Sequence, residues 1–390
     1  MAKALWLTSW YPNKLDAFNG DFIQRHARAA SLFNQVYVIH LEPDKENVLT
    51  VEKDETVLHT ENLTEVIILY KLVKKFSIIG KLLSYFKYLA LFKKQIKKYI
   101  AENGAPDVVH VHVPIKAGIL ALWVKRKYSI PFVVTEHWAI YNNEAPDAFY
   151  KRNALFKGMT KKILRQASAF TPVSLNLGQS IQKMVVDVPF TVIPNVADTL
   201  FFKYSGTGKN DGQVFTFLHA STLSYQKNPQ AILRAYKQFS ELHTASKLVM
   251  VGPADKTLIQ YASSLNIPAQ NIQFTGWLGY AEVAGTMKQG DAFVLFSRYE
   301  NLPCVIIEAL CSGLPVISTS VGGINEIIDE TNGVLLSTQE EAALLQAMVS
   351  LYNNYKNYNR GSIAKNAAIK FSYTAVGETI SNIYAAVKRT

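Results

Sequence analysis

Two carboxylates, Glu300 and Glu308, lie eight positions apart near the C-terminal end of the chain. A short apolar run at residues 293–296 precedes them and another at residues 316–318 follows, so the segment is expected to form strand, loop, helix and strand. Pro303 is favoured in a first helical turn, which places Glu300 in the loop and Glu308 about one and a half turns into the helix. Such carboxylates can exchange protons with a substrate or accept hydrogen bonds from its hydroxyl groups.

The start of this predicted helix is a candidate anion site. Backbone N–H groups at a helix N-terminus lack partners within the helix and attract anions, phosphate above all. Lys227 follows another predicted strand and can add a full positive charge. Either glutamate alone is better explained as a solvated acid, but the combination with Lys227 favours a ligand site. The N–H groups would come from Asn301, Leu302, Cys304 and Val305.

The rest of the chain predicts two domains that position these residues. A chain of 390 residues is too long for one ordinary core. Apolar strands alternate with helical segments in both halves, and no G-x-G-x-x-G motif is present. We predict two Rossmann-like doubly wound parallel-sheet domains of the α/β class that face a central cleft. The first domain consists of residues 1–195, joined by a C-terminal helix at 373–390, and the second consists of residues 196–372. A polar excursion is expected at 42–62, and a linker is expected near 203–213.

Positive charge is concentrated in the first half. The net charge is +11, and residues 1–195 carry 26 Lys and Arg against 16 Asp and Glu. The segment 71–100 holds nine lysines and no acid, interleaved with aromatic and aliphatic residues. It predicts a helix on an anionic membrane surface, and the alternative is a crossover helix that packs one face on the sheet and solvates its lysines. The candidate membrane or acceptor surface consists of Lys74, Lys75, Lys81, Lys87, Lys93 and Lys94.

Polar residues that follow predicted strands are further candidates, because ligands bind beyond the carboxyl ends of parallel strands. His137 follows such a strand and is expected to be functional, whereas at least one of His110 and His112 is expected to be a core residue. No His, Asp or Cys cluster has metal-site spacing, so neither metal nor cofactor is expected. The two cysteines, Cys304 and Cys311, are interpreted as buried thiols of a reducing compartment.

The pattern Glu300-x7-Glu308, followed by Val321-Gly-Gly-Ile-Asn-Glu326, resembles the signature of the retaining GT-B glycosyltransferases of the "glycosyl transferases group 1" class, of the family 4 type. The resemblance covers almost the whole chain. Its further motifs occur in the expected order at Gly20, 107–112, 135–137, 172–174, 193–195, 227–229 and 251–252.

This resemblance implies transfer of a sugar from a nucleotide diphosphate sugar, UDP-sugar favoured and GDP-sugar next, with retention and without a metal. Glu308 would hold the ribose hydroxyls, Glu300 the transferred sugar, and Lys227 the diphosphate. His137 would lie near the sugar on the acceptor side. The implied catalytic residues are Glu300, His137 and Lys227, and the implied donor-binding residues are Gly20, Thr222, Lys227, Asn301, Leu302, Val305, Glu308 and Glu326.

One position departs from the family pattern. Many relatives carry Gly-Arg before the lysine loop, and here Ser221 and Thr222 stand there without a charge. Arg298 and Arg25 are therefore candidates for a second phosphate contact.

The expected acceptor is a saccharide, favoured as lipid-linked, in bacterial-type surface polysaccharide or glycan assembly. No apolar run is long enough to span a membrane, and the first eight residues predict a strand and no signal peptide. We therefore expect a cytoplasmic enzyme, peripheral on the inner face of the membrane. One alternative is a soluble GT-B enzyme that glycosylates a small metabolite. A remote alternative is a basic nucleic-acid-binding protein, although the lysines match no recognised binding motif.

Overall fold

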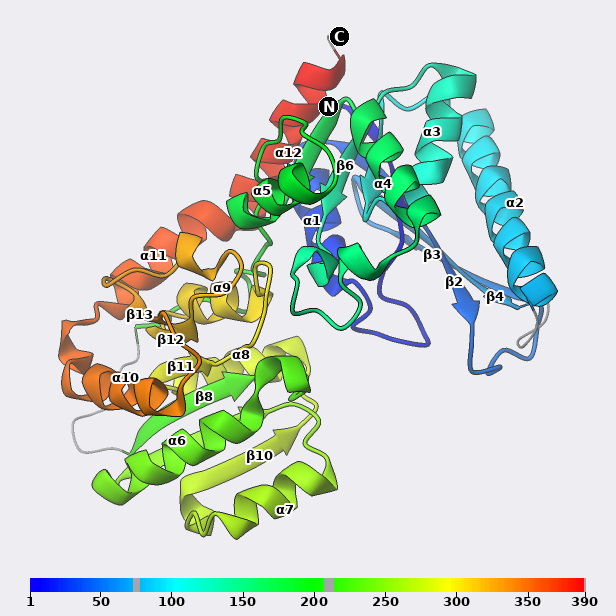
Figure 1. The fold of residues 1–390 in the computed structure, drawn as a ribbon. Helices are drawn as coiled ribbons and strands as arrows, with labels where there is room; N and C mark the ends of the chain where they lie inside the picture. The colour runs from blue at the N-terminus through cyan, green and yellow to red at the C-terminus, as the bar shows by residue number, and fades with distance from the viewer. Residues whose placement is uncertain (73–77, 207–213, 389–390) are drawn as a thin grey trace. The chain divides into compact units, whose positions relative to one another are not determined.

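The computed structural model describes residues 1–72, 78–206 and 214–388, which form two compact α/β units (Figure 1). The first unit comprises Met1–Tyr141, Asp147–Val196 and Tyr373–Thr390, and the second comprises Asn142–Pro146 and Ala197–Ser372. The expected boundary between residues 195 and 196 lies one residue before the observed one.

The first unit is built on a seven-stranded sheet in the order β3-β4-β2-β1-β5-β6-β7. All neighbours are parallel except β3, which runs antiparallel to β4. Strands β1 and β5 are buried along nearly their whole length, as expected for a sheet covered on both faces. The strands are β1 (Lys3–Thr8), β2 (Gln35–Asp44), β3 (Lys53–His59), β4 (Leu63–Lys71), β5 (Val108–His112), β6 (Phe132–Glu136) and β7 (Ala169–Pro172).

The polar excursion predicted at residues 42–62 is largely exposed, but it contains the end of β2 and the whole of β3. Strand β2 continues to Asp44, and β3 pairs with β4 along its whole length, with Thr56 opposite Ile67. Most side chains of β3 are exposed. An edge strand that contacts solvent in this way has no run of core residues, so hydrophobic patterning does not reveal it.

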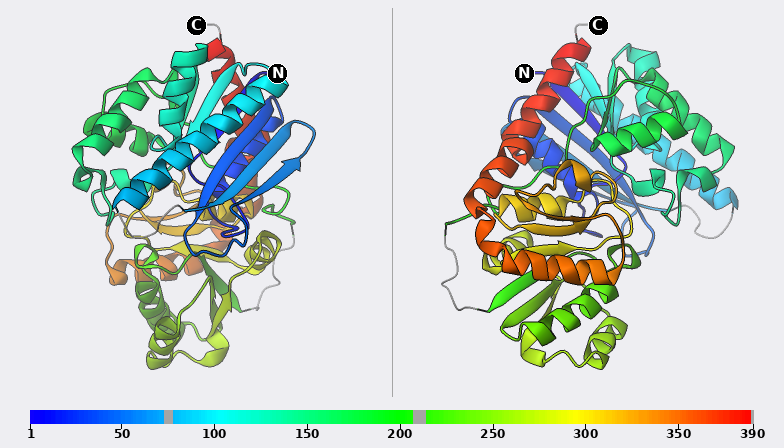
Figure 2. Two further views of the ribbon diagram at one scale, coloured as in Figure 1. Left: turned by 90° about the vertical axis from the view of Figure 1, so that its right-hand side faces the viewer. Right: turned by 60° about the vertical axis from the view of Figure 1, so that its left-hand side comes forward.

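Helices cover both faces of the first sheet. Helices α1 (Asp21–Ser31) and α12 (Tyr373–Lys388) pack together on one face, and α2 (Ile78–Asn103) and α3 (Ala117–Tyr128) lie on the other (Figures 1 and 2). The core beneath α1 and α12 contains the fully buried Trp6. The remaining helices are α4 (Ala154–Gln166) and α5 (Leu175–Met184), with single turns η1 (Ala139–Tyr141) and η2 (Phe149–Lys151).

The second unit has a six-stranded, fully parallel sheet in the order β10-β9-β8-β11-β12-β13. Helices α6 and α10 supply much of its larger core. The strands are β8 (Phe215–Ala220), β9 (Ser246–Val251), β10 (Ile272–Gly276), β11 (Ala292–Leu295), β12 (Val316–Thr319) and β13 (Gly333–Leu336). The helices are α6 (Pro229–Leu242), α7 (Lys256–Ser264), α8 (Tyr280–Gln289), α9 (Cys304–Cys311), α10 (Glu341–Asn353) and α11 (Arg360–Phe371), with turns η3 (Tyr225–Lys227), η4 (Ala269–Asn271), η5 (Ile324–Glu326) and η6 (Tyr355–Asn357).

Each sheet has one point at which its strand order reverses. In the first sheet β1 lies between β2 and β5, and in the second β8 lies between β9 and β11. The prediction of two Rossmann-like doubly wound sheets is thereby confirmed. Ligands of such sheets bind outside the carboxyl ends of the strands at this reversal, which directs attention to the loops after β1 and β5 and after β8 and β11.

Candidate active site

Lys227 and Glu300 meet at the reversal point of the second sheet. Lys227 ends turn η3, which follows β8, and Glu300 lies in the loop that follows β11. The Lys227 ammonium forms an ion pair with Glu300 Oε1, and the two side chains are only 16% and 7% exposed. Two residues that lie 73 positions apart in sequence therefore form one charged centre.

Arg298 holds the two loops together. Its backbone N–H donates to Gln226 O at 2.8 Å, and its Nη2 donates to Asn228 Oδ1 at 2.8 Å. The guanidinium lies 4.3 Å from the ring centroid of Tyr225, and Gln226 Nε2 donates back to Tyr299 O at 2.9 Å. The contacts of Arg298 thus fix the Lys227 loop against the Glu300 loop.

Helix α9 carries Glu308. The helix begins at Cys304, with Pro303 at the N-cap position, one residue earlier than the first-turn position expected. Glu308 is only 6% exposed. Burial, with the nearby charge of Glu308, raises the pKa of the Cys311 thiol to about 12, so this cysteine is neutral and inert. Among the implied donor-binding residues, Val305 lies in the first helical turn and is partly exposed, whereas Leu302 is buried.

The turn after β12 encloses the Glu300 loop. Gly322 has a φ of +60°, and a Cβ there would lie 2.1 Å from Glu300 O. The next residue, Gly323, donates its N–H to Asn301 O at 2.6 Å. Only glycine fits this combination of left-handed backbone and close approach. The turn therefore fixes the backbone that carries Glu300.

A neutral network surrounds Ser221, which precedes the position at which the family resemblance led us to expect an arginine. The buried His219 donates from Nδ1 to Val294 O at 2.8 Å and contacts Ser221 Oγ through Nε2 at 2.7 Å. Ser221 Oγ also accepts from Leu223 N at 2.9 Å. Burial lowers the pKa of His219 to about 4, so the ring is neutral at pH 7. The network shapes the loop but adds no positive charge. Thr222 is exposed and donates to Ser224 Oγ at 3.2 Å.

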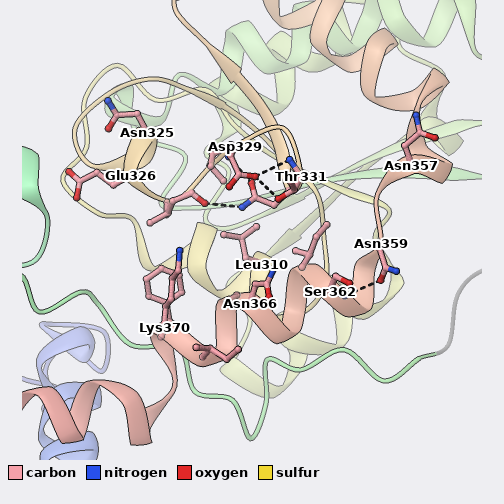
Figure 3. A pocket seen from close by; sticks show the side chains of 17 residues that line it. Leu310, Asn325, Glu326, Asp329, Thr331, Asn357, Asn359, Ser362, Asn366 and Lys370 are labelled. Carbon is pink, nitrogen blue, oxygen red and sulfur yellow. Dashed lines mark hydrogen bonds between the residues drawn. The ribbon is translucent and has the colours of Figure 1, made fainter.

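Glu326 lies at the end of η5 and lines a separate pocket of about 620 Å³ in the second unit (Figure 3). The pocket lies between the loop at residues 325–332 and helix α11, and neither Glu300, Glu308 nor Lys227 lines it. Figure 3 shows Asn366 and Lys370 of α11 on the same pocket. The structure therefore assigns the Glu326 side chain to this pocket, while the turn that precedes it contacts the Glu300 loop.

Two residues predicted near the diphosphate belong to the first unit. Gly20 precedes α1 with a φ of +66°, and a Cβ there would lie 2.7 Å from the backbone carbon of Trp10. Glycine is thus required by the fold of this loop. Arg25 is buried and donates to Asp21 Oδ2 at 2.9 Å and to Val196 O at 3.1 Å. Arg25 is therefore engaged in packing α1 within this unit.

His137 directly follows β6 and is partly buried. Its Nε2 lies 3.0 Å from His112 Nδ1, with the two rings stacked at 18°. Burial lowers the pKa of His137 well below its usual value, so the ring is neutral at pH 7. Glu136 Oε1 accepts from the backbone N–H groups of His137 and Trp138, both at 2.8 Å, and thereby fixes the turn that presents His137.

The neighbouring His110 is a satisfied core residue, as predicted for at least one of the strand histidines. It is buried and contacts Tyr384 Oη at 2.6 Å and Thr135 Oγ1 at 2.7 Å. Both cysteines are free thiols. Across residues 1–72, 78–206 and 214–388, no group of three or more His, Cys, Asp or Glu side chains is arranged to hold a metal ion.

Helix α2 is amphipathic, but its lysines differ in their surroundings. Lys87 pairs with Glu52 at 3.2 Å, and Lys93 lies 5.4 Å from the ring centroid of Trp123. Lys81 and Lys94 are exposed and make no ion pair with any residue that the structure describes. The other two candidates, Lys74 and Lys75, lie outside the described residues.

The apolar side chains of α2 divide between two surfaces. Tyr88, Phe92 and Ile96 are buried against the sheet, as expected for a crossover helix. The first turns expose a different set, with Leu82 54% and Phe86 56% exposed. No helix in the described parts of the chain combines the length and the apolar character needed to cross a bilayer.

Two family models together match most of the chain. The model "Glycosyltransferase Family 4" matches residues 30–200, and "Glycosyl transferases group 1" matches residues 203–368. The fold resembles sucrose-phosphate synthase from Thermosynechococcus elongatus, with a TM-score of 0.78, 17% identity and 99% of each chain covered. Anabaena HepE in complex with UDP is also similar, with a TM-score of 0.72, 17% identity and 98% of this chain and 100% of that chain covered. The chain belongs to the group 1 glycosyltransferases with the GT-B fold, as predicted.

Two curated relatives match over a large part of the chain. The alpha-monoglucosyldiacylglycerol synthase of Streptococcus pneumoniae is 26% identical over 64% of this chain, and the match spans 61% of that enzyme's length. The UDP-Gal:alpha-D-GlcNAc-diphosphoundecaprenol alpha-1,3-galactosyltransferase of Escherichia coli is 26% identical over 71% of this chain and 72% of its own.

Proposed function

We propose that this protein transfers a sugar from a nucleotide diphosphate sugar, with UDP as the favoured nucleotide, to a saccharide acceptor. The observation that carries the proposal is the Lys227–Glu300 centre at the reversal point of the second sheet, beside the start of α9 and the buried Glu308. A cation, a helix N-terminus and two carboxylates are the groups that a diphosphate with attached sugars requires.

In the proposed reaction, Lys227 exchanges Glu300 for an oxygen of the donor diphosphate. As the bond to the anomeric carbon breaks, the leaving diphosphate gains negative charge, and the ammonium and the α9 N-terminus stabilise it. Glu308 accepts from the ribose hydroxyls and Glu300 from hydroxyls of the transferred sugar. Because these groups supply the positive charge, we propose that no metal is required. The acceptor oxygen forms its bond to the anomeric carbon on the face that the diphosphate leaves, and the proton of the acceptor hydroxyl passes to the departing diphosphate. We therefore propose that the anomeric configuration is retained, through an oxocarbenium-like transition state.

Similar proteins support the choice of UDP and of a lipid-linked acceptor. Anabaena HepE was determined with UDP, and the E. coli relative is named for a UDP-galactose donor and a diphosphoundecaprenol-linked acceptor. We propose an acceptor of the second kind, in the assembly of a surface polysaccharide or glycan. His137 is proposed to lie on the acceptor side.

The exposed apolar side chains of α2, with Lys81 beside them, support peripheral attachment to the cytoplasmic face of a membrane. A small-metabolite acceptor is the second candidate. The observation that favours it is the engagement of Lys87 and Lys93 within the first unit, which leaves fewer lysines for an anionic surface.

A thermal-shift experiment with UDP-, GDP- and ADP-glucose tests the donor. A ligand that binds only the folded state raises its unfolding temperature. We expect a shift with the UDP-sugar that Lys227→Ala and Glu308→Ala each abolish. Lys256→Gln and Glu330→Gln, which alter exposed residues of the same unit, serve as matched controls. Equal shifts in all four variants, or none in the wild type with any of the three sugars, would contradict the proposal.

A further inference from the structure

A second crevice lies at the reversal point of the first sheet. It has a volume of about 330 Å³ and lies between the loop after β1, the end of β2 and the loop after β5. Ser9 Oγ donates to Ile115 O at 2.9 Å and so ties the two loops together. This is the place where a doubly wound sheet binds its ligand, yet none of the candidate donor-binding residues lines it.

A carboxylate in this crevice, that of Glu42, is held by the buried His40, the half-buried Asn19 and the exposed Lys45, whose Nζ lies 3.6 Å from Glu42 Oε1. Glu42 Oε2 lies 3.5 Å from His40 Nε2 and accepts from Asn19 Nδ2 at 3.4 Å. His40 is fully buried, and its other ring nitrogen lies 3.2 Å from Thr8 Oγ1. Burial acts to raise the pKa of Glu42, but the contact with His40 and the charges of Lys45 and Lys116 lower it below its usual value. Glu42 is therefore an ionised, oriented hydrogen-bond acceptor.

Lys116 brings a cation to the same crevice from a strained turn. Its backbone has φ 73° and ψ −71°, and Val113 at the start of this turn has a φ of 67°. A β-branched residue in this region is a conformational outlier, and such strain persists where the surrounding structure enforces it, often at ligand sites. Among the described residues, the Lys116 ammonium makes no hydrogen bond or ion pair. Partial burial lowers its pKa, against the opposing effect of Glu42.

The walls of the crevice are fixed by side-chain to backbone hydrogen bonds. Asp44 accepts from the N–H groups of Val48 and Leu49 at 3.0 and 2.8 Å. On the opposite wall, Asn13 Oδ1 accepts from Leu15 N at 2.9 Å. The crevice is thus formed in advance of any ligand, as small-molecule sites usually are.

The charges that line the crevice limit what it can bind. Asp16, Glu42 and Glu46 face Lys45 and Lys116, so the acids outnumber the lysines by one. A phosphate or carboxylate ligand would meet an excess of like charge. A neutral polyhydroxylated molecule would not, because its hydroxyl groups can donate to Glu42 and accept from Lys116. The half-buried indole of Trp10 adds an apolar surface of the kind that packs against a sugar ring.

We propose that this crevice binds a neutral saccharide unit of the acceptor, with Glu42 accepting from two of its hydroxyls and Lys116 donating to an oxygen of the same unit. This inference rests on the proposed glycosyltransfer, because it assigns the acceptor of that reaction. It also places any phosphate of a lipid-linked acceptor outside the crevice.

Saturation-transfer NMR with neutral methyl glycosides of glucose, galactose, mannose and N-acetylglucosamine tests the assignment, with glucose 1-phosphate as the charged probe. We expect at least one neutral glycoside to bind the wild type and glucose 1-phosphate to bind more weakly. Glu42→Gln and Lys116→Met should each weaken glycoside binding at least tenfold. Glu102→Gln and Lys161→Gln, on exposed helix positions of the same unit, should change it less than twofold.

The result distinguishes this inference from the proposed donor reaction. If UDP-glucose binds in a Lys227-dependent way while Glu42→Gln and Lys116→Met bind glycosides as the wild type does, the crevice assignment is wrong and the donor site stands. Failure of all four glycosides to bind overturns the assignment as well. If glycoside binding depends on Glu42 but no nucleotide sugar binds, the crevice is a saccharide site, and its assignment to the acceptor is wrong together with the donor reaction. A circular dichroism spectrum and an unfolding temperature equal to those of the wild type show that the crevice variants fold.

Discussion

The ammonium of Lys227 is paired with the carboxylate of Glu300. Both side chains are largely buried, so each charge depends on the other for compensation. If a diphosphate oxygen binds the Lys227 ammonium, it must therefore replace the Glu300 carboxylate. The carboxylate can then accept hydrogen bonds from hydroxyl groups of the sugar. The ion pair couples diphosphate binding to the exposure of the carboxylate that would contact the transferred sugar.

This coupling predicts opposite effects of the two residues on UDP binding. Glu300→Gln removes the competing carboxylate, so UDP should bind as tightly as to the wild type or more tightly, while transfer falls by about a hundredfold or more. Lys227→Ala removes a charge-assisted hydrogen bond, which corresponds to about 1.5–3 kcal/mol and hence to a roughly 10–100-fold loss of UDP affinity. Isothermal titration with UDP and a transfer assay measure the two effects separately.

The partly exposed Lys237, which pairs with Glu241 on α6, provides the control. Lys237→Ala should leave UDP affinity and transfer unchanged, because surface ion pairs contribute little. Weaker UDP binding by Glu300→Gln would contradict the proposed exchange, as would full transfer activity in Lys227→Ala.

Gly322→Ala tests whether the turn after β12 positions Glu300. The new Cβ would lie 2.1 Å from Glu300 O, at a φ of +60°. We expect a loss of stability of more than about 1 kcal/mol and at least a tenfold loss of UDP-sugar binding. Gly285 lies within α8, and a Cβ there meets no atom within 4 Å. Gly285→Ala should instead stabilise the protein by about 0.5–1 kcal/mol. Differential scanning calorimetry compares the two, and a stable Gly322→Ala that binds normally would refute the positioning role.

Much of this arrangement could be predicted from the sequence, because strand ends and helix starts carry clear local signals. The apolar runs before Glu300 and Lys227 identify two strands, and the carboxyl ends of parallel strands share one edge. The ion pair itself could not be predicted, since it depends on β8 and β11 being neighbours in the sheet. Nothing local to either motif encodes that adjacency.

The crevice of the first unit was missed for a related reason. Glu42 was assigned to a polar excursion, whereas it lies on β2 within reach of the buried His40. The positive φ of Lys116 could not be predicted, because lysine has no preference for the left-handed region. A polar residue two positions beyond a buried strand histidine was the available signal. The contacts of Arg298 with the Lys227 loop could not be predicted either, because an arginine near a proposed phosphate site suggests a ligand contact before a structural one.

The exposed apolar side chains at the start of α2 predict binding to anionic vesicles. Complete burial of an exposed Leu or Phe side chain in the membrane would contribute about 1.5–3 kcal/mol to binding. Leu82→Ser combined with Phe86→Ser should therefore reduce sedimentation with phosphatidylglycerol vesicles at least tenfold. Leu242→Ser with Ile259→Ser changes exposed apolar residues of the second unit and is the matched control. Equal sedimentation of both double variants would favour the small-metabolite alternative, as would a wild type that remains in the supernatant.

Glu136 should make the stability of the first unit depend on pH. Burial raises its pKa to about 7, although the N–H groups of His137 and Trp138 and the hydroxyl of Tyr141 act to lower it. Because the folded pKa exceeds the unfolded value of 4.5, the unfolded chain loses this proton first as the pH rises. The stability that Glu136 contributes is therefore complete below pH 4.5 and is lost as the pH passes through about 7. One-site linkage sets an upper value of about 3 kcal/mol for this loss.

The comparison of wild type with Glu136→Gln isolates this effect. His26, with a pKa lowered to about 4 by burial, acts in the opposite direction, since its contribution is lost as the pH falls below 6.5. His26 is present in both proteins and cancels in their difference. We expect the stability of the wild type relative to Glu136→Gln to fall by up to about 3 kcal/mol between pH 4.5 and 8.

Urea unfolding at several pH values, followed by tryptophan fluorescence, measures this difference. Trp6, Trp10, Trp123 and Trp138 lie in the first unit, and only Trp277 lies in the second, so the signal reports mainly on the unit that contains Glu136. Glu102→Gln, on an exposed position of α2, should give a difference that does not change with pH. A pH-independent difference for Glu136→Gln would mean that the pKa of Glu136 in the folded state is no higher than its unfolded value of 4.5. Its three donors would then offset the cost of burial, and the turn that presents His137 would be held by a carboxylate throughout the range from pH 4.5 to 8.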